Sequence, residues 1–222
     1  MVQGSQSNSG KHHKEDISSI VYVVDDDESV RSALGNLLRS TGLRVETFAS
    51  SKEFLAFPKY DAPSCLILDV RLRGESGLTF QEDATRADLR IPILFITAHG
   101  DIEMSVRAMK AGAFDFFSKP VRDQDMLEAV TYALRRDGER LAAEASIAAL
   151  RIAYDSLTPR EREVMGFVVA GLMNKQIASA MGLSEITVKI HRGQMMKKLD
   201  SRSVPDLVRK GEALGVRPQH PK

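Results

Sequence analysis

The stretch VYVVDDDESV, residues 21–30, decides the fold, because a short apolar run leads directly into three aspartates and a glutamate. Successive apolar residues are typical of a strand that is covered on both faces of a parallel sheet. Neighbouring carboxylates repel one another, and none is buried cheaply without a partner. The stretch therefore indicates either a solvated loop or a cation site at the end of a buried strand.

Four further strand-like runs follow, and residues with helical spacing or a capped helix start lie between most of them. They are LRVETF (43–48), CLILDV (65–70), IPILFITA (91–98) and DFFSKP (115–120). The first helix is marked by Val30, Leu34 and Leu38, and Gly42 ends it. Such alternation of strands and helices, repeated five times, predicts an α/β fold with a doubly wound parallel sheet.

In such a sheet, functional groups gather beyond the carboxyl ends of the strands. Asp25 and Asp26 end the first strand, Asp69 the third, Thr97 the fourth and Lys119 the fifth. Carboxylates that share a site favour a hard divalent cation, so we expect Mg²⁺, or Mn²⁺ in its place. A carboxylate there could also accept a phosphoryl group, whose charge the metal and the lysine would neutralise.

Composition limits the class of protein. The 222 residues, 43% of them apolar and 27% charged, indicate one or two ordinary globular domains. A single cysteine, Cys65, excludes a disulfide framework and fits a cytoplasmic protein. No run of residues is long and apolar enough to predict a membrane span. Residues 1–16 have no apolar core of a signal peptide, so we expect a disordered tail.

Charge divides the chain into two parts. Residues 17–136 hold 15 Lys and Arg against 18 Asp and Glu, whereas residues 154–222 hold 12 against 7. The basic second part is a candidate for binding a polyanion. We expect a first domain at residues 17–136, a helical linker at 137–154 and a second domain at 155–222.

The second part contains a predicted helix-turn-helix. Thr158, Pro159 and Glu161 form a helix start with a capping box. Two short helices follow, with Gly182 in the turn between them and Ser184 as the cap of the second. Such a pair of helices commonly places its second helix in the major groove of DNA.

Candidate DNA contacts lie on and around this second helix. An exposed Ile190 beside Lys189 suits a thymine methyl and a guanine, whereas His191 faces inward with the apolar side chains. Other polar side chains are candidates for the backbone phosphates. The candidates are Lys189, Ile190, Thr187, Arg192, Gly193, Lys197, Asn174, Lys175 and Arg202, and Lys198 is a further candidate for a phosphate contact.

The predicted linker between the two parts is rich in helix-forming residues. Residues 127, 134, 141 and 148 are Leu, Leu, Leu and Ala, a spacing of seven. Positions 137, 144 and 151, which alternate with them, are Asp, Glu and Arg. A linker helix is therefore expected, with Gly138 as a candidate hinge, and a coiled coil is left open.

Taken together, VVDDDES, LILDVRL, FITAHGD and FSKP resemble the receiver domain of response regulators, and IASAMGLSEITVKIHRGQMMKKL resembles a LuxR-type helix-turn-helix. The whole chain resembles the FixJ/NarL family, which implies a strand order of 2-1-3-4-5 and an all-helical second domain. The resemblance implies that Asp69 is the phosphoacceptor. It also implies that Asp25, Asp26, Asp69 and the backbone carbonyl of Arg71 hold the metal.

The same resemblance implies a switch. Thr97 would supply the switch hydroxyl, with Ala98 beside it in the phosphate site, Lys119 would pair with the phosphate, and the ring of Phe116 would follow Thr97. One position departs from the family pattern, because Arg73 stands where a proline is usual. This departure, with Arg71 and His99, bears on how long the phosphoryl group persists.

The resemblance implies a two-component regulator rather than an enzyme. A sensor histidine kinase would phosphorylate Asp69, and homodimerisation through the surface from residues 101–113 to 125–130 would promote binding to double-stranded DNA. RNA polymerase is a further candidate partner, and a membrane is not. Two alternatives are a phosphate-ester hydrolase of the haloacid-dehalogenase kind, disfavoured because its nucleophile lies on the first strand, and a regulator that binds DNA constitutively.

Overall fold

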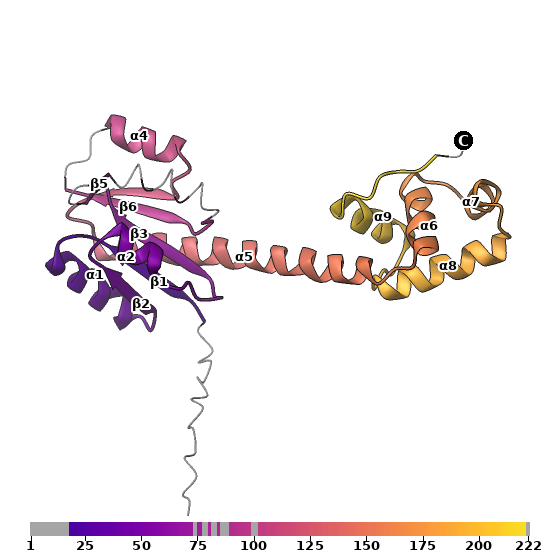
Figure 1. The fold of residues 1–222 in the computed structure, drawn as a ribbon. Coiled ribbons are helices and arrows are strands. Elements are labelled where there is room, and N and C mark those ends of the chain that lie inside the picture. The colour runs from indigo at the N-terminus through magenta and orange to yellow at the C-terminus, as the bar shows by residue number, and fades with distance from the viewer. Residues whose placement is uncertain are drawn as a thin grey trace, which may run out of the picture. The chain divides into compact units, whose positions relative to one another are not determined.

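The computed structural model describes residues 18–220, apart from residues 73–74, 77–79, 81–83, 85–88 and 99–101. The chain forms two compact units that divide after Arg140 (Figure 1). Arg73, His99 and the tail of residues 1–16 lie outside the described residues. Among the described helices, none is both long and apolar enough to span a membrane.

A five-stranded parallel sheet forms the centre of the first unit. Its order is β2-β1-β3-β6-β7, which confirms the predicted order of the five strands. The strands are β1 (Ile20–Val24), β2 (Arg44–Phe48), β3 (Ser64–Asp69), β6 (Ile93–Thr97) and β7 (Asp115–Ser118). A short antiparallel hairpin follows β3. It pairs β4 (Arg71–Leu72) with β5 (Glu75–Ser76), and the sequence did not indicate it.

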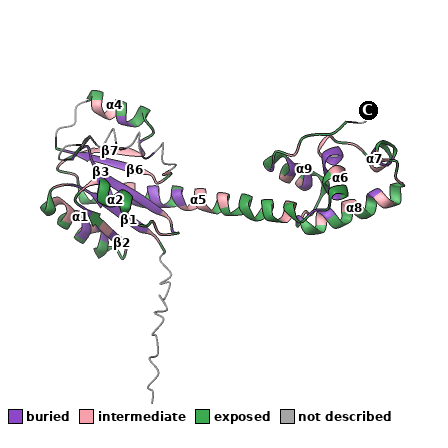
Figure 2. Cartoon of the chain, in the orientation of Figure 1, coloured by how far each residue is buried: buried purple, intermediate pink, exposed green. Residues whose placement is uncertain are grey.

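Helices cover both faces of this sheet, which explains why β1, β3 and β6 are apolar on successive residues. One face packs against α1 (Glu28–Ser40) and α5 (Asp123–Asp155) through Leu38 and Met126. The other packs against α2 (Ser51–Ala56) and α4 (Ile102–Lys110) through Phe54 and Ala108. Figure 2 shows the three central strands, β1, β3 and β6, buried between these layers.

The third aspartate of the opening stretch begins α1. Asp27 is the N-cap residue, and its carboxylate accepts a hydrogen bond from the Ser29 N–H at 2.8 Å. A carboxylate at this position satisfies a free amide and interacts favourably with the helix dipole. Of the three consecutive aspartates, only Asp25 and Asp26 are therefore available for a cation site at the edge of the sheet.

Four helices form the second unit together with the end of α5: α6 (Pro159–Val169), α7 (Asn174–Met181), α8 (Glu185–Lys198) and α9 (Val204–Ala213). The predicted capping box of Thr158 and Glu161 is present. Gly182 adopts a left-handed conformation with φ of 65°, and the Ser184 side chain caps α8. The two helices α7 and α8 thus form the predicted helix-turn-helix.

Two helical glycines of this unit should respond oppositely to alanine. A Cβ on Gly211 of α9 would lie 2.5 Å from Cγ2 of Val169, so Gly211→Ala should destabilise the unit by about 1–3 kcal/mol. On Gly193 of α8, the described residues leave a Cβ free of neighbours within 4 Å. Gly193→Ala should therefore stabilise by up to about 1 kcal/mol. Denaturant unfolding of the full chain measures both, and equal effects would contradict the tight crossing of α6 and α9.

Candidate functional site

The carboxyl ends of three neighbouring strands bring the predicted acidic cluster together. β1, β3 and β6 lie side by side in parallel, with Val24 opposite Leu68 and Asp69 opposite Ile96. Asp25 directly follows β1, and Asp69 is the last residue of β3. The two carboxylates therefore meet at one edge of the sheet, although they are 44 positions apart in the sequence.

Lys119 joins these two carboxylates. Its Nζ donates to Oδ2 of Asp25 and to Oδ2 of Asp69, at 2.7 Å in each case. Asp25 is fully buried and Asp69 is 6% exposed, so each needs such a partner. Charge-assisted hydrogen bonds of this length are the strong ones. The structure thus confirms that residues 94 positions apart in sequence converge at one point.

The protonation equilibria of the cluster reflect its burial. Burial raises the pKa of the Asp25 carboxyl by more than the Lys119 ammonium and the Asp27 N–H lower it. For Lys119, burial lowers the pKa, but the hydrogen bonds to Asp25 and Asp69 outweigh it and leave the pKa above its ordinary value. Lys119 therefore remains a cation at neutral pH, facing the phosphoacceptor candidate.

The donor set of this edge fits a hard divalent cation. Asp25, Asp26 and Asp69 can each offer one carboxylate oxygen, and these oxygens lie within 4.8 Å of one another. One oxygen of Asp25 accepts from the Asp27 N–H and one of Asp69 from the Arg71 N–H, both at 2.9 Å, which orients both carboxylates. An all-oxygen, acidic set of this kind is typical of Mg²⁺ sites.

The remaining predicted receiver residues lie along β6 and β7. Thr97 is the last residue of β6 and is buried, and its carbonyl accepts from the Lys119 N–H at 2.7 Å. Ala98, next in the chain, is exposed. Phe116 lies on β7 opposite Phe95 and packs, partly buried, against the core. The hydroxyl and the ring thus occupy adjacent strands, at and near the acidic edge.

The predicted DNA-binding residues fall into two groups. Exposed side chains or backbone are found at Lys189, Ile190, Gly193, Lys197, Lys175 and Arg202. The other three are half-buried and make contacts within the unit. The Thr187 hydroxyl lies 2.8 Å from the Ser184 hydroxyl, and the Arg192 guanidinium donates to the Asn174 side chain. The first group is therefore available to a ligand, whereas Arg192 and Asn174 hold α8 against α7.

An ion pair between an exposed lysine and a buried glutamate, which the sequence did not reveal, fixes the end of α8. Lys198 donates to Oε2 of Glu161 at 2.7 Å, and Glu161 is 1% exposed. Burial alone would raise the pKa of Glu161, but Lys198 and the Thr158 N–H hold it below its ordinary value. Glu161 was predicted only as a cap. Its second partner lies 37 residues away, and no local pattern indicates it.

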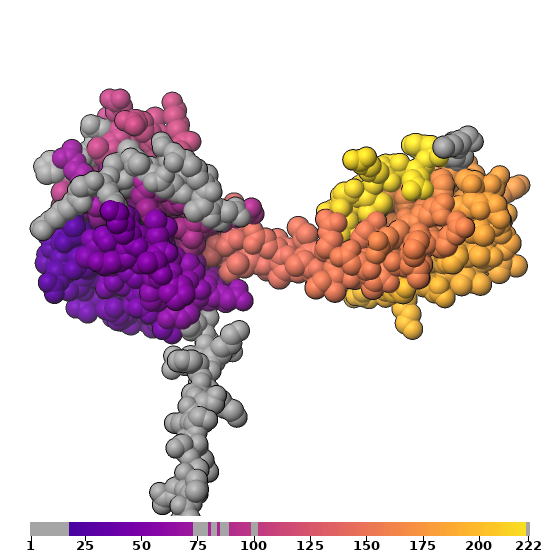
Figure 3. Space-filling view, in the orientation of Figure 1, coloured from indigo at the N-terminus to yellow at the C-terminus, as the bar shows by residue number. Residues whose placement is uncertain are grey.

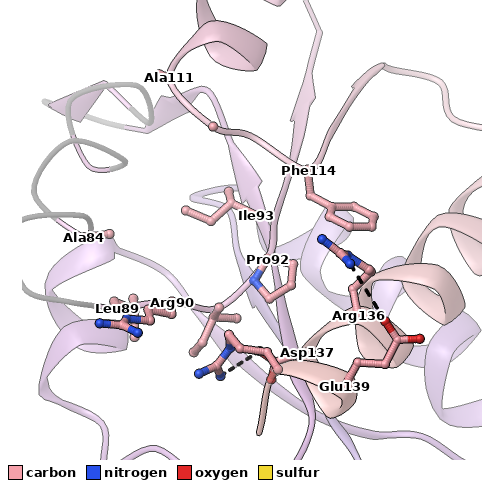
Figure 4. A pocket seen from close by; sticks show the side chains of 13 residues that line it. Ala84, Leu89, Arg90, Pro92, Ile93, Ala111, Phe114, Arg136, Asp137 and Glu139 are labelled. Atoms are coloured by element: carbon pink, nitrogen blue, oxygen red, sulfur yellow. Dashed lines mark hydrogen bonds and ion pairs between the residues drawn. The ribbon is translucent and has the colours of Figure 1, made fainter. Parts of the chain in front are cut away.

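A separate cavity of about 720 Å³ lies at the other edge of the sheet in the first unit (Figure 4). Its lining includes Ile93, the first residue of β6, and Asp137 of α5. Asp137 is buried, accepts from the Ser64 N–H at 2.8 Å and pairs with Arg140. Since Thr97 ends the strand that Ile93 begins, this cavity is distinct from the acidic cluster. Asp137 secures α5 to the start of β3.

Comparison with known protein families agrees with both units. Residues 21–131 match the response regulator receiver domain, and residues 155–210 match the bacterial regulatory proteins of the luxR family. The chain belongs to the FixJ/NarL family of response regulators. It is a two-component transcriptional regulator with a LuxR-type DNA-binding domain, and its family is one of regulators rather than enzymes.

Relatives match along most of this response regulator. Nodulation protein W of Bradyrhizobium diazoefficiens is 52% identical over 95% of this chain and 93% of its own length. The transcriptional regulatory protein FixJ of Rhizobium meliloti is 39% identical over 89% and 97%. The solved structure of the response regulator StyR is 48% identical, covers 88% of this chain and 98% of its own, and has a TM-score of 0.78.

Membership of this family implies two kinds of partner. A receiver domain implies a histidine kinase, and a LuxR-type helix-turn-helix implies DNA. The acidic triad of Asp25, Asp26 and Asp69 is typical of the magnesium site of a receiver domain. The family therefore accounts for the charge at the end of β1.

Proposed function

We propose that phosphorylation of Asp69 by a sensor histidine kinase switches this regulator into a dimer that binds a specific DNA sequence. The observation that supports it most is the position of Lys119, whose Nζ lies 2.7 Å from both Asp25 and Asp69. A cation held beside a carboxylate nucleophile neutralises the oxygens of an incoming phosphoryl group. The five positions Asp25, Asp26, Asp69, Thr97 and Lys119 have no other evident shared use.

The transfer step follows from the geometry of this edge. An oxygen of Asp69 attacks the phosphorus of the kinase's phosphohistidine, an O–P bond forms, and the N–P bond breaks with its electron pair returning to the imidazole. Lys119 stabilises the charge on the phosphoryl oxygens, and the Arg71 N–H orients the Asp69 carboxylate. Asp25, Asp26, Asp69 and the carbonyl of Arg71 would hold Mg²⁺, or Mn²⁺. The metal would supply further charge neutralisation.

Thr97 and Phe116 are proposed to carry the signal from this edge. A phosphoryl group brings a charge of about −1.5 to −2 and three acceptor oxygens. The Thr97 hydroxyl would donate to it, with Ala98 beside it, and the Phe116 ring on the neighbouring strand would move toward the core. The strand of Phe116, β7, contacts α4, whose Ile102, Val106 and Met109 are exposed. Figure 3 shows α4 at the surface of the unit. Homodimerisation through this apolar surface is supported by that exposure.

The second unit is proposed to read DNA through α8. Lys189 and Ile190 would reach base edges. Gly193 and Lys197 would follow on the same side of α8, one and two turns further along. Lys175 and Arg202 would meet phosphates, and Thr187, Arg192 and Asn174 would support that placement. A two-fold dimer places two such helices one DNA turn apart.

The surroundings proposed for this regulator follow from its partners. DNA and RNA polymerase as partners, and a single buried Cys65, fit a cytoplasmic location. We propose domain limits of 17–136 for the receiver, 137–154 for the linker and 155–222 for the DNA-binding domain, preceded by a disordered tail at 1–16.

Removing single basic side chains should distinguish contacts to DNA bases, which give sequence specificity, from contacts to DNA phosphates, which do not. Lys189→Ala should lower discrimination between DNA sequences by about 1–3 kcal/mol at one base pair. Lys175→Ala should weaken binding to all DNA sequences. It should also make the plot of log binding constant against log salt concentration less steep, by about 1. Fluorescence anisotropy at several salt concentrations measures both, with Lys52→Ala in the first unit as the control. If all three variants showed the same affinity, sequence discrimination and salt dependence, α8 would not be the helix that reads DNA.

Magnesium should stabilise the first unit through the acidic cluster. At a concentration about 100 times its dissociation constant, Mg²⁺ should add about 2.7 kcal/mol to the free energy of unfolding. Asp26→Asn should lose most of this gain, whereas Asp61→Asn, a change at an exposed acid, should keep it. Thermal unfolding with Mg²⁺ and with EDTA measures the difference. The same gain in both variants would place the metal elsewhere.

The proposed function is tested by the oligomeric state of the full chain. After incubation with acetyl phosphate and Mg²⁺, size-exclusion chromatography with light scattering should show a shift from monomer to dimer. Intact mass on the same sample should show one added phosphate. A chain that binds specific DNA equally well in both states would support a constitutive DNA-binding protein instead.

A further inference from the structure

We infer that the second half of α5 forms a two-stranded parallel coiled coil with α5 of a second copy of this chain, once the receiver domains are phosphorylated. This proposal rests on the proposed function, because phosphorylation brings the two copies together. It concerns residues 141–152, which follow the division between the two units. It adds an interface to the one proposed on α4.

One face of this half of α5 is already occupied. Leu150, Ala153 and Tyr154 pack against the core of the second unit, and Leu157, just beyond the helix, is buried there. At about 100° per residue, Leu150, Ala153 and Tyr154 lie on a single side of the helix. The end of α5 is thereby attached to its own DNA-binding domain along that side.

The opposite face carries a second apolar stripe, which we name the linker seam: Leu141, Ala145, Ala148 and Ile152. Successive residues of the seam are four, three and four positions apart, so they lie within about 60° of one another and about 180° from Leu150. Ile152 is 73% exposed, Ala145 and Ala148 are exposed, and Leu141 is half-buried. Figure 2 shows this half of α5 as mostly exposed. The seam therefore faces away from the core that its own helix helps to form.

The spacing of the seam continues a pattern in the sequence. Leu134, Leu141 and Ala148 recur every seven residues, and the residues three positions after each are Asp137, Glu144 and Arg151, which argued against a coiled coil. The residues four positions after each are instead Gly138, Ala145 and Ile152. Alternation of four and three is the spacing of a coiled-coil seam, so the heptad pattern is apolar at both of its core positions.

A second copy of this chain is the occupant that fits best. A repeat of seven residues is self-complementary in a parallel pair, where each core position meets its own equivalent. In that pairing Glu144 would face Ala149 of the other copy and Arg151 would face Ser156, so these flanking positions oppose no like charges. The next core position is Asp155, the last residue of α5, where two like charges would meet, so the seam ends at Ile152. Alanine at two core positions allows the two helices to approach closely. A parallel pair also keeps both DNA-binding domains at the same end.

The seam is too short to join two copies by itself. It offers only two heptads, and alanine buries little apolar area at each position. A first contact between receivers would raise the effective concentration of the two seams to the millimolar range, at which a weak interface forms. The seam would then convert a receiver dimer into a defined separation of two α8 helices.

A cysteine cross-link tests this directly, because the chain has one cysteine, Cys65, and it is buried. Ala148→Cys lies in the seam, whereas Ala143→Cys is exposed on another side of the same helix, about 140° away. With acetyl phosphate, Mg²⁺ and mild oxidation, Ala148→Cys should form a disulfide-linked dimer at least ten times faster than Ala143→Cys. Equal rates at the two positions would overturn the proposal.

Two isoleucines of the helix supply a matched second test. Ile152→Glu places a charge in the seam, and Ile147→Glu places one at a 50% exposed position outside it. Ile152→Glu should weaken the phosphorylated dimer at least tenfold, with phosphate uptake unchanged, and Ile147→Glu should have little effect. Equal dimerisation by both variants would overturn the seam.

A failure of the proposed function would be recognised separately. Absence of added phosphate by intact mass, or absence of any dimer of the native chain, would contradict the phosphorylation switch rather than the seam. The cross-link is then measured at millimolar protein, where concentration replaces the receiver contact. A preference for Ala148→Cys over Ala143→Cys there would support the seam, and equal rates would overturn it.

Discussion

Asp69→Asn should abolish phosphate uptake entirely. An amide is a far weaker nucleophile than a carboxylate, and Asp69 ends β3 at the point where Lys119 and Asp25 converge. The native chain should gain one phosphate from acetyl phosphate in the presence of Mg²⁺, and Asp69→Asn should gain none. Intact mass measures this directly. The same variant should remain monomeric and bind DNA with the affinity of the unphosphorylated chain.

The control for this prediction is Asp61→Asn, since Asp61 is an exposed acid eight residues before Asp69 and outside the cluster. It should take up phosphate at the native rate. Phosphate on Asp69→Asn at the native rate would show that another residue accepts the phosphoryl group. Acetyl phosphate needs no kinase, so the outcome does not depend on which kinase is the partner.

Glu161→Ala should cost the DNA-binding domain about 3 kcal/mol. Glu161 is 1% exposed, completes the capping box of α6 and pairs with Lys198 at 2.7 Å. The Lys198 side chain is 36% exposed and can rehydrate, so the cost comes from the hydrogen bonds of the Glu161 carboxylate to Lys198 and to the Thr158 N–H, each worth about 1.5–3 kcal/mol for a charged group. The melting temperature of this domain should fall by roughly 12–24 °C.

Glu163→Ala is the matched control, two residues further along α6. Glu163 pairs with Arg160, but both side chains are more than a third exposed, so this pair should contribute at most about 1 kcal/mol. Differential scanning calorimetry of the full chain separates the two cases. A loss below about 1 kcal/mol for Glu161→Ala would mean that the pair with Lys198 does not hold α8 in place.

The sequence predicted that Asp25, Asp69 and Lys119 converge, and it could do so because its signals are local. Each functional residue lies at the end of an apolar run, and the parallel order of the strands then brings those ends together. Asp25, Asp69 and Lys119 therefore meet without any long loop having to be predicted. The helix starts at Thr158 and Ser184 were predictable for the same reason, since a cap and its partner lie within one turn.

The contacts that the sequence did not reveal join side chains far apart in the chain. Lys198 resembled a phosphate contact in an exposed, charged helix end, yet it lies against Glu161. Arg192 and Asn174, both predicted as DNA contacts, hydrogen-bond to each other. Asp137 looked only like a polar position in a heptad, but its partner is Ser64, 73 residues earlier. Such pairs depend on how helices pack, and no spacing along one element specifies them.

The measurement that tests the central claim most directly is the DNA affinity of the full chain before and after phosphorylation. A duplex is first selected from a random pool with the phosphorylated chain, and its dissociation constant is then measured at fixed salt with and without acetyl phosphate. Phosphorylation should tighten binding by the native chain at least tenfold and leave Asp69→Asn unchanged. Equal affinity of the native chain in both states, with one phosphate confirmed by mass, would contradict the switch.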